Sequence, residues 1–63
     1  MKKSTWVIDL FEEFEAGEWQ WVIFNRLQPN IVFESNSYYT RKSDALRGAR
    51  RVAKALRINA EVG

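Results

Sequence analysis

A chain of 63 residues has room for one domain, and a domain of that size buries only about 60% of its unfolded surface. Cysteine and histidine are absent, which excludes disulfides, thiolate metal sites and the usual catalytic base at neutral pH. Hydrophobic residues make up 46% of the chain and aromatic residues 14%, which excludes intrinsic disorder. We therefore expect one folded domain over residues 1–63, with a marginal stability that oligomerisation would raise.

Charge is unevenly distributed along the chain. The net charge is +2, but residues 1–34 carry a balance of −3 and residues 35–63 a balance of +5. The two parts attract each other, within one chain or between two. Apolar runs are too short for a transmembrane helix, and Asp9 and Glu12 interrupt any signal-peptide core. We expect a cytoplasmic protein without a membrane partner.

The segment 5–14 is expected to form a first strand, because apolar residues recur at every second position from Trp6 to Leu10. Gly17 can take a positive φ, so a turn centred on residues 16–17 is expected to follow. That turn places three pairs of residues opposite one another: Phe14 and Trp19, Glu12 and Trp21, Leu10 and Ile23. Glu12 is the misfit, and it needs either the rim of the sheet or a bulge that shifts the register.

Residues 19–26 are expected to return as a second strand with two apolar faces. Trp19 and Trp21 share one face because they lie two positions apart, and Val22 and Phe24 share the other. A small sheet normally buries only one face. The second apolar face therefore indicates a partner.

Two further elements follow a break at residues 28–30, where proline removes a ladder donor. Residues 31–34 are expected to form a short third strand. From Arg41 onward the apolar period becomes that of an amphipathic helix, with Thr40 as its N-cap. The apolar stripe of this helix consists of Ala45, Ala49, Val52, Ala53 and Leu56.

Gly48 lies inside the predicted helix, where glycine costs about 1 kcal/mol relative to alanine. We expect it to let the helix approach the sheet closely, so that Trp19 and Trp21 fit beneath small residues. Residues 58–62 alternate again and indicate a very short fourth strand. The predicted fold class is α+β: a three-stranded antiparallel meander, one amphipathic helix and a short C-terminal strand.

Two runs of residues have a recognisable pattern. Residues 17–21 read Gly-Glu-Trp-Gln-Trp, and residues 35–42 read Ser-Asn-Ser-Tyr-Tyr-Thr-Arg-Lys, followed by Ala45, Gly48 and Val52. In these runs the chain resembles the YegP-like family of small, mostly bacterial proteins of unknown function. The resemblance covers roughly residues 8–62. It implies that a single-repeat chain such as this one forms a homodimer with one continuous sheet and exchanged C-terminal strands.

The residues themselves also favour a dimer. One helix on a three-stranded sheet leaves an apolar patch on the other face, which soluble monomers usually avoid. We predict a non-catalytic interaction module whose partners are a second copy of itself and another protein. The predicted association residues are Phe11, Val22, Phe24, Ile58, Ala60 and Val62.

Nucleic-acid binding is the alternative function. Basic residues recur at spacings of three and four along the predicted helix, and such a stripe can neutralise phosphates. The residues concerned are Arg47, Arg50, Arg51, Lys54 and Arg57. Residues that would read bases are not evident, and a solvated helix face explains the stripe equally well. Protein association is therefore preferred and nucleic acid kept as the alternative.

Catalysis, cofactors and metal ions are not expected. The sequence has no phosphate-binding glycine loop and no nucleophile elbow. Carboxylates gather near the first turn, at Glu12, Glu13, Glu15 and Glu18, but their spacing matches no calcium loop. We interpret them as the solvated tip of a hairpin.

Three residues before and in the first helical turn need separate treatment. Tyr39 is expected to cover the end of the sheet, as half-buried tyrosines often do. Tyr38 must point away from the core if Tyr39 points toward it, and its role stays open between structure and stacking on a ligand. Lys42 is expected to be a solvated residue of the first turn.

Overall fold

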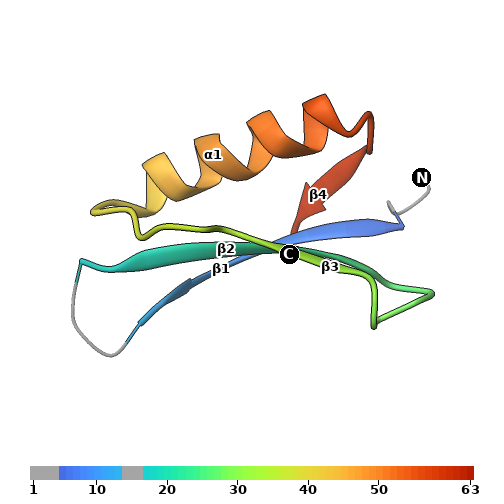
Figure 1. Cartoon of the computed structure of the whole chain (residues 1–63), viewed down its shortest axis with the longest axis horizontal. Helices are drawn as coiled ribbons and strands as arrows, with labels where there is room; N and C mark the ends of the chain where they lie inside the picture. The colour runs from blue at the N-terminus through green and yellow to red at the C-terminus, as the bar shows by residue number, and fades with distance from the viewer. Residues whose placement is uncertain (1–4, 14–16) are drawn as a thin grey trace.

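The computed structural model describes residues 5–13 and 17–63 and contains four strands and one helix in these ranges. In chain order they are β1 (Trp6–Glu12), β2 (Trp19–Asn25), β3 (Val32–Glu34), α1 (Lys42–Ala55) and β4 (Ala60–Val62). The strands form one sheet in the order β3-β2-β1-β4, and α1 lies across one face of it (Figure 1). The predicted α+β fold and its element order are confirmed.

The sheet is mixed. β1, β2 and β3 form the predicted antiparallel meander, whereas β4 pairs in parallel with β1, opposite Trp6, Val7 and Ile8. A parallel partner cannot follow through a tight hairpin, so α1 provides the crossover from β3 to β4. Within one chain β4 thus becomes an edge strand, and its other edge is open among the described residues.

The predicted register of β1 and β2 is wrong by two residues. Glu12 lies opposite Trp19 rather than Trp21, while Leu10 faces Trp21 and Ile8 faces Ile23. The side chain of Glu12 explains the shift, because its Oε2 accepts the Gly17 N–H at 2.8 Å at the exposed end of the sheet. In the expected register this carboxylate would have faced the buried Trp21. Its position at the rim confirms one of the two expected solutions, and Phe14 lies outside the described residues.

The break between β2 and β3 is a turn fixed by side-chain and backbone hydrogen bonds. Asn25 Oδ1 accepts the N–H groups of Leu27 at 2.8 Å and Gln28 at 3.0 Å. The Ile31 N–H then donates to the Gln28 carbonyl at 2.9 Å, which closes a turn around Pro29. The expected break at residues 28–30 is confirmed.

The core lies between the alanine stripe of α1 and the facing residues of β1 and β2. Its buried members are Ile8, Trp21, Ile23, Ala45, Ala49 and Ala53. Trp19 packs against this cluster from the end of β2. Large side chains from the sheet therefore meet small ones from the helix, as the sequence predicted for Trp19 and Trp21.

The capping residues at both ends of α1 are unusual ones. The N-cap is Arg41, with φ −134° and ψ 146° and no capping side chain, so the prediction of Thr40 is wrong by one residue. At the C-terminal end, the Ile58 N–H donates a hydrogen bond to the Ala53 carbonyl, and the Arg57 N–H donates one to the Lys54 carbonyl. These two bonds are those of a Schellman cap, in which glycine is usual at the left-handed position. Here Arg57 holds that position, with φ +58°.

Gly48 is predicted to be intolerant of alanine. A Cβ atom there would lie 2.5 Å from Tyr39 Oη and 3.3 Å from Trp21 Nε1. The steric cost exceeds the gain of about 1 kcal/mol in helix propensity, so Gly48→Ala should lower the free energy of unfolding by about 1 kcal/mol. Urea denaturation measures this.

The matched control removes the Tyr39 hydroxyl, whose oxygen is the atom nearest to the added Cβ. Tyr39→Phe combined with Gly48→Ala should recover part of the loss relative to the sum of the two single variants. If Gly48→Ala is more stable than the parent chain, the close approach of the helix to Tyr39 is refuted.

Candidate functional site

The segment between β3 and α1 leaves the sheet and then returns to it. At Ser35 the backbone N–H donates to the Trp21 carbonyl at 3.0 Å, and Ser35 Oγ accepts the Trp21 N–H at 3.3 Å. The backbones of Trp19 and Tyr39 then exchange two hydrogen bonds, of 2.7 and 2.8 Å. Residues 36–38 lie between these two attachments. The hydrogen bonds fix where Tyr38 and Tyr39 leave the backbone.

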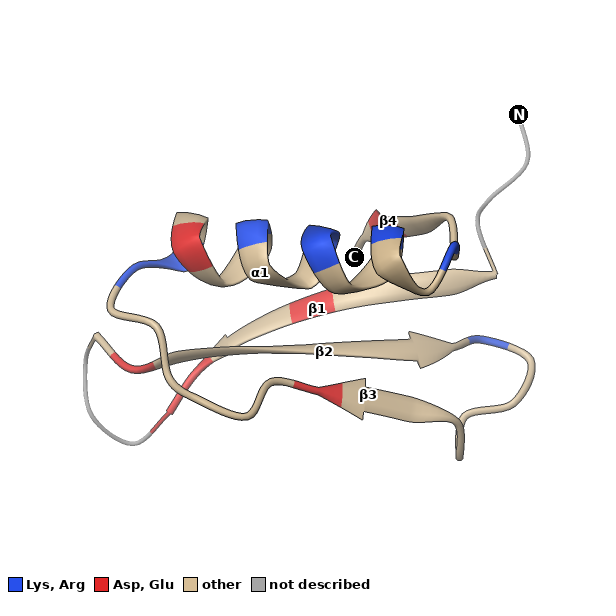
Figure 2. Ribbon diagram, turned by 45° about the horizontal axis from the view of Figure 1, so that its top comes forward, with Lys and Arg blue, Asp and Glu red and all other residues tan. Residues whose placement is uncertain are grey.

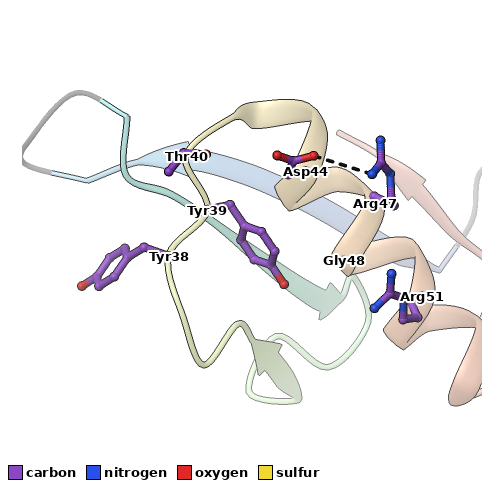
Figure 3. Close-up of a pocket in the computed structure, with 7 residues that line it drawn as sticks. All are labelled: Tyr38, Tyr39, Thr40, Asp44, Arg47, Gly48 and Arg51. Carbon is purple, nitrogen blue, oxygen red and sulfur yellow. Dashed lines mark ion pairs between the residues drawn. The ribbon is translucent and has the colours of Figure 1, made fainter.

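A pocket of about 400 Å³ lies between this segment and α1. Its lining residues are Tyr38, Tyr39, Thr40, Asp44, Arg47, Gly48 and Arg51. Figure 3 shows the Tyr39 ring directed toward Gly48 and the Tyr38 ring directed away from the helix. We call this the loop–helix pocket.

The wall of the loop–helix pocket is tightly packed at Tyr39. Its hydroxyl lies against the backbone of α1 at Gly48, where a Cβ atom would have no room. The indole of Trp21 lies beside it, 5% exposed, and Trp21 Nε1 is buried without a hydrogen-bond partner among the described residues. The expected covering role of Tyr39 agrees with this packing.

Three charged side chains are linked at the N-terminal turn of α1. Asp44 Oδ2 lies 3.2 Å from Arg41 Nε, and Asp44 Oδ1 lies 3.7 Å from Arg47 Nη1. The two arginines share the carboxylate, and both are largely exposed. Exposed pairs of this kind contribute about 0–1 kcal/mol each. In the described ranges Arg51 makes no ion pair or hydrogen bond, so its guanidinium is available to a ligand.

Basic residues recur along α1 (Figure 2), and four members of the predicted stripe, Arg47, Arg50, Arg51 and Lys54, are exposed there, opposite the buried alanines. The prediction is wrong for Arg57, which lies beyond the helix because α1 ends at Ala55. Within the stripe the structure brings Arg47 and Arg51 to the loop–helix pocket, together with Tyr38. Arg50, Lys54 and Arg57 are exposed but do not line this pocket. Lys42 is not simply solvated, because its Nζ lies 5.7 Å from the centroid of the Trp19 ring in a cation–π contact.

The face of the sheet opposite α1, which we call the open face, is partly apolar. Phe11 and Val32 are 38% and 44% exposed on it, and Val22 and Phe24 are half-buried. Val7 is also on this face but is only 4% exposed. Its position in the sheet lies between Phe24 of β2 and Glu61 of β4.

Acidic residues accompany the apolar ones on the open face. Asp9 and Glu34 both lie opposite Val22, one on each side. Glu61 pairs with Arg26 at 2.8 Å, and this ion pair ties the end of β2 to β4 across β1. The open face therefore combines apolar and acidic side chains, and α1 carries the basic ones (Figure 2).

The other predicted association residues lie in and before β4. Ile58 and Ala60 pack against the core of their own chain, and Val62 is 44% exposed. The structure therefore separates the six predicted residues into two groups. Phe11, Val22 and Phe24 lie on the open face. The other three lie on the side of the helix: Ile58 and Ala60 pack against the core, and Val62 pairs with Ile8.

Sequence reasoning missed three residues of the loop–helix pocket: Thr40, Asp44 and Gly48. The spacing of Asp44 and Arg47, three positions apart on a helix, was a usable signal for their ion pair. Gly48 was predicted to permit close packing over Trp19 and Trp21, and Trp21 does lie there, but the contact with Tyr39 was not predicted. Among the described residues no group of three or more acidic, histidine or cysteine side chains could hold a metal ion.

Comparison of the chain with family models, curated proteins and solved structures gave no match. The resemblance to YegP-like proteins therefore stays a prediction. In the described part of the chain, no helix has the length and apolar character needed to cross a membrane.

Ser35→Ala is predicted to loosen the segment that carries Tyr38 and Tyr39. The Trp21 N–H loses a partly buried acceptor, which should lower the free energy of unfolding by about 1 kcal/mol. Ser35→Thr keeps the hydroxyl and is the control, measured by urea denaturation. Equal stability of all three chains would contradict the role assigned to Ser35 Oγ.

Proposed function

We propose that this chain is a small non-catalytic interaction module that acts as a homodimer by exchanging β4 between two copies. A cytoplasmic location and membership of the YegP-like family are parts of the same proposal. The family resemblance supports exchange, because single-repeat members of that family are expected to share their C-terminal strands. The contacts around β4 support it independently.

The connection between α1 and β4 is the observation that carries the proposal. Only residues 56–59 separate the two elements, and Arg57 is the one non-glycine residue with positive φ in the described ranges. A left-handed conformation costs an ordinary L-residue about 1–2 kcal/mol. Short connections under strain favour domain exchange, because opening them releases the strain.

Exchange would keep the contacts that β4 makes now. Ile58 and Ala60 would pack on the core of a second copy, and β4 would pair with the β1 of that copy in the same register. The two hydrogen bonds of the Schellman cap would be lost, but their carbonyls would become solvated. The balance therefore depends on the strain at Arg57 and on new contacts between the two copies.

The open face supplies such contacts. Phe11, Val22 and Phe24 present apolar surface there, and a second copy would remove it from water. Asp9 and Glu34 on the same face attract the basic part of a second copy, since seven basic residues and one acidic residue lie between positions 41 and 57. A second copy fits both the apolar and the electrostatic character of this face.

The mass in solution is the first prediction of the proposal. Light scattering should give twice the chain mass of 7.4 kDa. Arg57→Gly removes the strain from both closed chains and should raise the dissociation constant of the dimer about 30-fold, since about 2 kcal/mol is released. Arg57→Ala removes the same charge, keeps the strained conformation and serves as the control. A parent chain that is monomeric at millimolar concentration would refute the proposal.

Deletion of residues 58–63 tests the strand itself. The shortened chain should be monomeric or unfolded, because the exchanged strand and its pairing with β1 are both lost. Light scattering and far-UV circular dichroism measure the two outcomes. A shortened chain that remains dimeric and equally stable would contradict strand exchange.

A further inference from the structure

We propose that the loop–helix pocket binds a phosphate group of single-stranded nucleic acid and that Tyr38 stacks on an adjoining base. All of the pocket's lining residues come from one chain, so the site forms without the dimer, but the ligand and the open face of a second copy compete for the same basic surface. Such a site gives a ligand to two features that the sequence left separate, the helix arginines and the exposed tyrosine.

Arg47 and Arg51 lie one helical turn apart and both line the loop–helix pocket. Arginine presents several N–H donors in a planar fork that matches phosphate oxygens. Arg51 has no partner among the described residues, and Arg47 has only the exposed contact of 3.7 Å with Asp44. Both guanidinium groups are therefore available for an anion.

Asp44 also lines the pocket, and an unpaired carboxylate would repel a phosphate. Here Arg41 lies 3.2 Å from its other oxygen, Oδ2, and offsets its charge. The local balance of Arg41, Arg47, Arg51 and Asp44 is positive. The pocket thus attracts an anion although it contains a carboxylate.

Hydroxyl groups on the other side of the loop–helix pocket complete a set of donors. Tyr39 and Thr40 both line it. A tyrosine or threonine hydroxyl can donate a hydrogen bond to a phosphate oxygen, so the pocket offers donors from the segment before α1 as well as from the helix.

The position of Tyr38 favours a nucleic-acid strand over an isolated anion. Its side chain is 56% exposed and extends away from the helix at the margin of the pocket (Figure 3). Exposed aromatic rings beside a basic surface stack on unpaired bases, whereas the bases of a duplex are already stacked on each other. Lys54, one turn beyond Arg51 along α1, is exposed and extends the positive surface for a neighbouring phosphate.

Fluorescence anisotropy with a labelled 12-mer of deoxythymidine tests the proposal on the full chain. Arg51→Gln should weaken binding about tenfold and lower the salt slope by about 0.7, the contribution of one contact to a single strand. Arg50→Gln is the matched control, because it removes the same charge from the same helix outside the pocket. It should weaken binding less than about threefold.

Tyr38 gives a readout that charge alone does not. Tyr38→Ala should weaken binding about tenfold without changing the salt slope, and Tyr38→Phe should bind like the parent chain. A duplex of the same length and thymidine monophosphate should each bind at least about tenfold more weakly than the single strand. Circular dichroism confirms that each variant is folded.

Several results would overturn the proposal. Equal losses for Arg50→Gln and Arg51→Gln would show general electrostatic attraction without a pocket. Equal or tighter binding of the duplex, or of thymidine monophosphate, would show a different ligand. Unchanged affinity of Tyr38→Ala would refute the stacking, and no binding of the 12-mer at low salt would refute the site itself.

Discussion

The contact of Tyr39 and Trp21 with the backbone of α1 at Gly48 is the constraint on which the other features depend. Without a side chain at position 48, the helix approaches until the Tyr39 hydroxyl lies against it. Ala45 and Ala49, on the same helix, are fully buried. This contact sets the distance between the two layers, and it also holds the segment before α1 in place.

Two surfaces follow from this arrangement. A single helix with a face of small residues covers one side of the sheet and directs its basic side chains to solvent. The other side of the sheet has no element over it among the described residues, so apolar and acidic side chains stay exposed there. Because three of the seven buried hydrophobic residues are alanines, the core alone removes little apolar surface from water. Association is a natural source of additional stability for a chain of this kind.

Periodicity was sufficient to predict the elements. Alternation from Trp6 to Leu10 and from Trp19 to Phe24 indicated the strands, and the alanine stripe indicated the helix that covers Trp21. The register of β1 and β2 could not be predicted, because it depends on a hydrogen bond from Gly17 to the Glu12 side chain. Turn chemistry of this kind is set by geometry that residue patterns do not contain.

The loop–helix pocket was beyond sequence reasoning for a similar reason. Its shape depends on where the segment after β3 returns to the sheet, and this is fixed by the pairing of Tyr39 with Trp19. The two residues lie far apart in the sequence, and no local pattern of residues predicts their pairing. The helix residues of the basic stripe were predicted correctly as an exposed surface. Only the fold shows that Arg47 and Arg51 line the pocket and that Arg50 does not.

Nuclear Overhauser contacts between the ring protons of Tyr39 and the α-protons of Gly48 test the central claim most directly. The structure predicts strong cross-peaks, because the Tyr39 ring lies against the helix backbone at this residue. Because the Tyr39 ring lies against Gly48, the chemical shifts of the Gly48 α-protons are also expected to move upfield. Absence of these cross-peaks in a folded chain would mean that the helix sits higher on the sheet. The pocket and the explanation of Gly48 would then both be wrong.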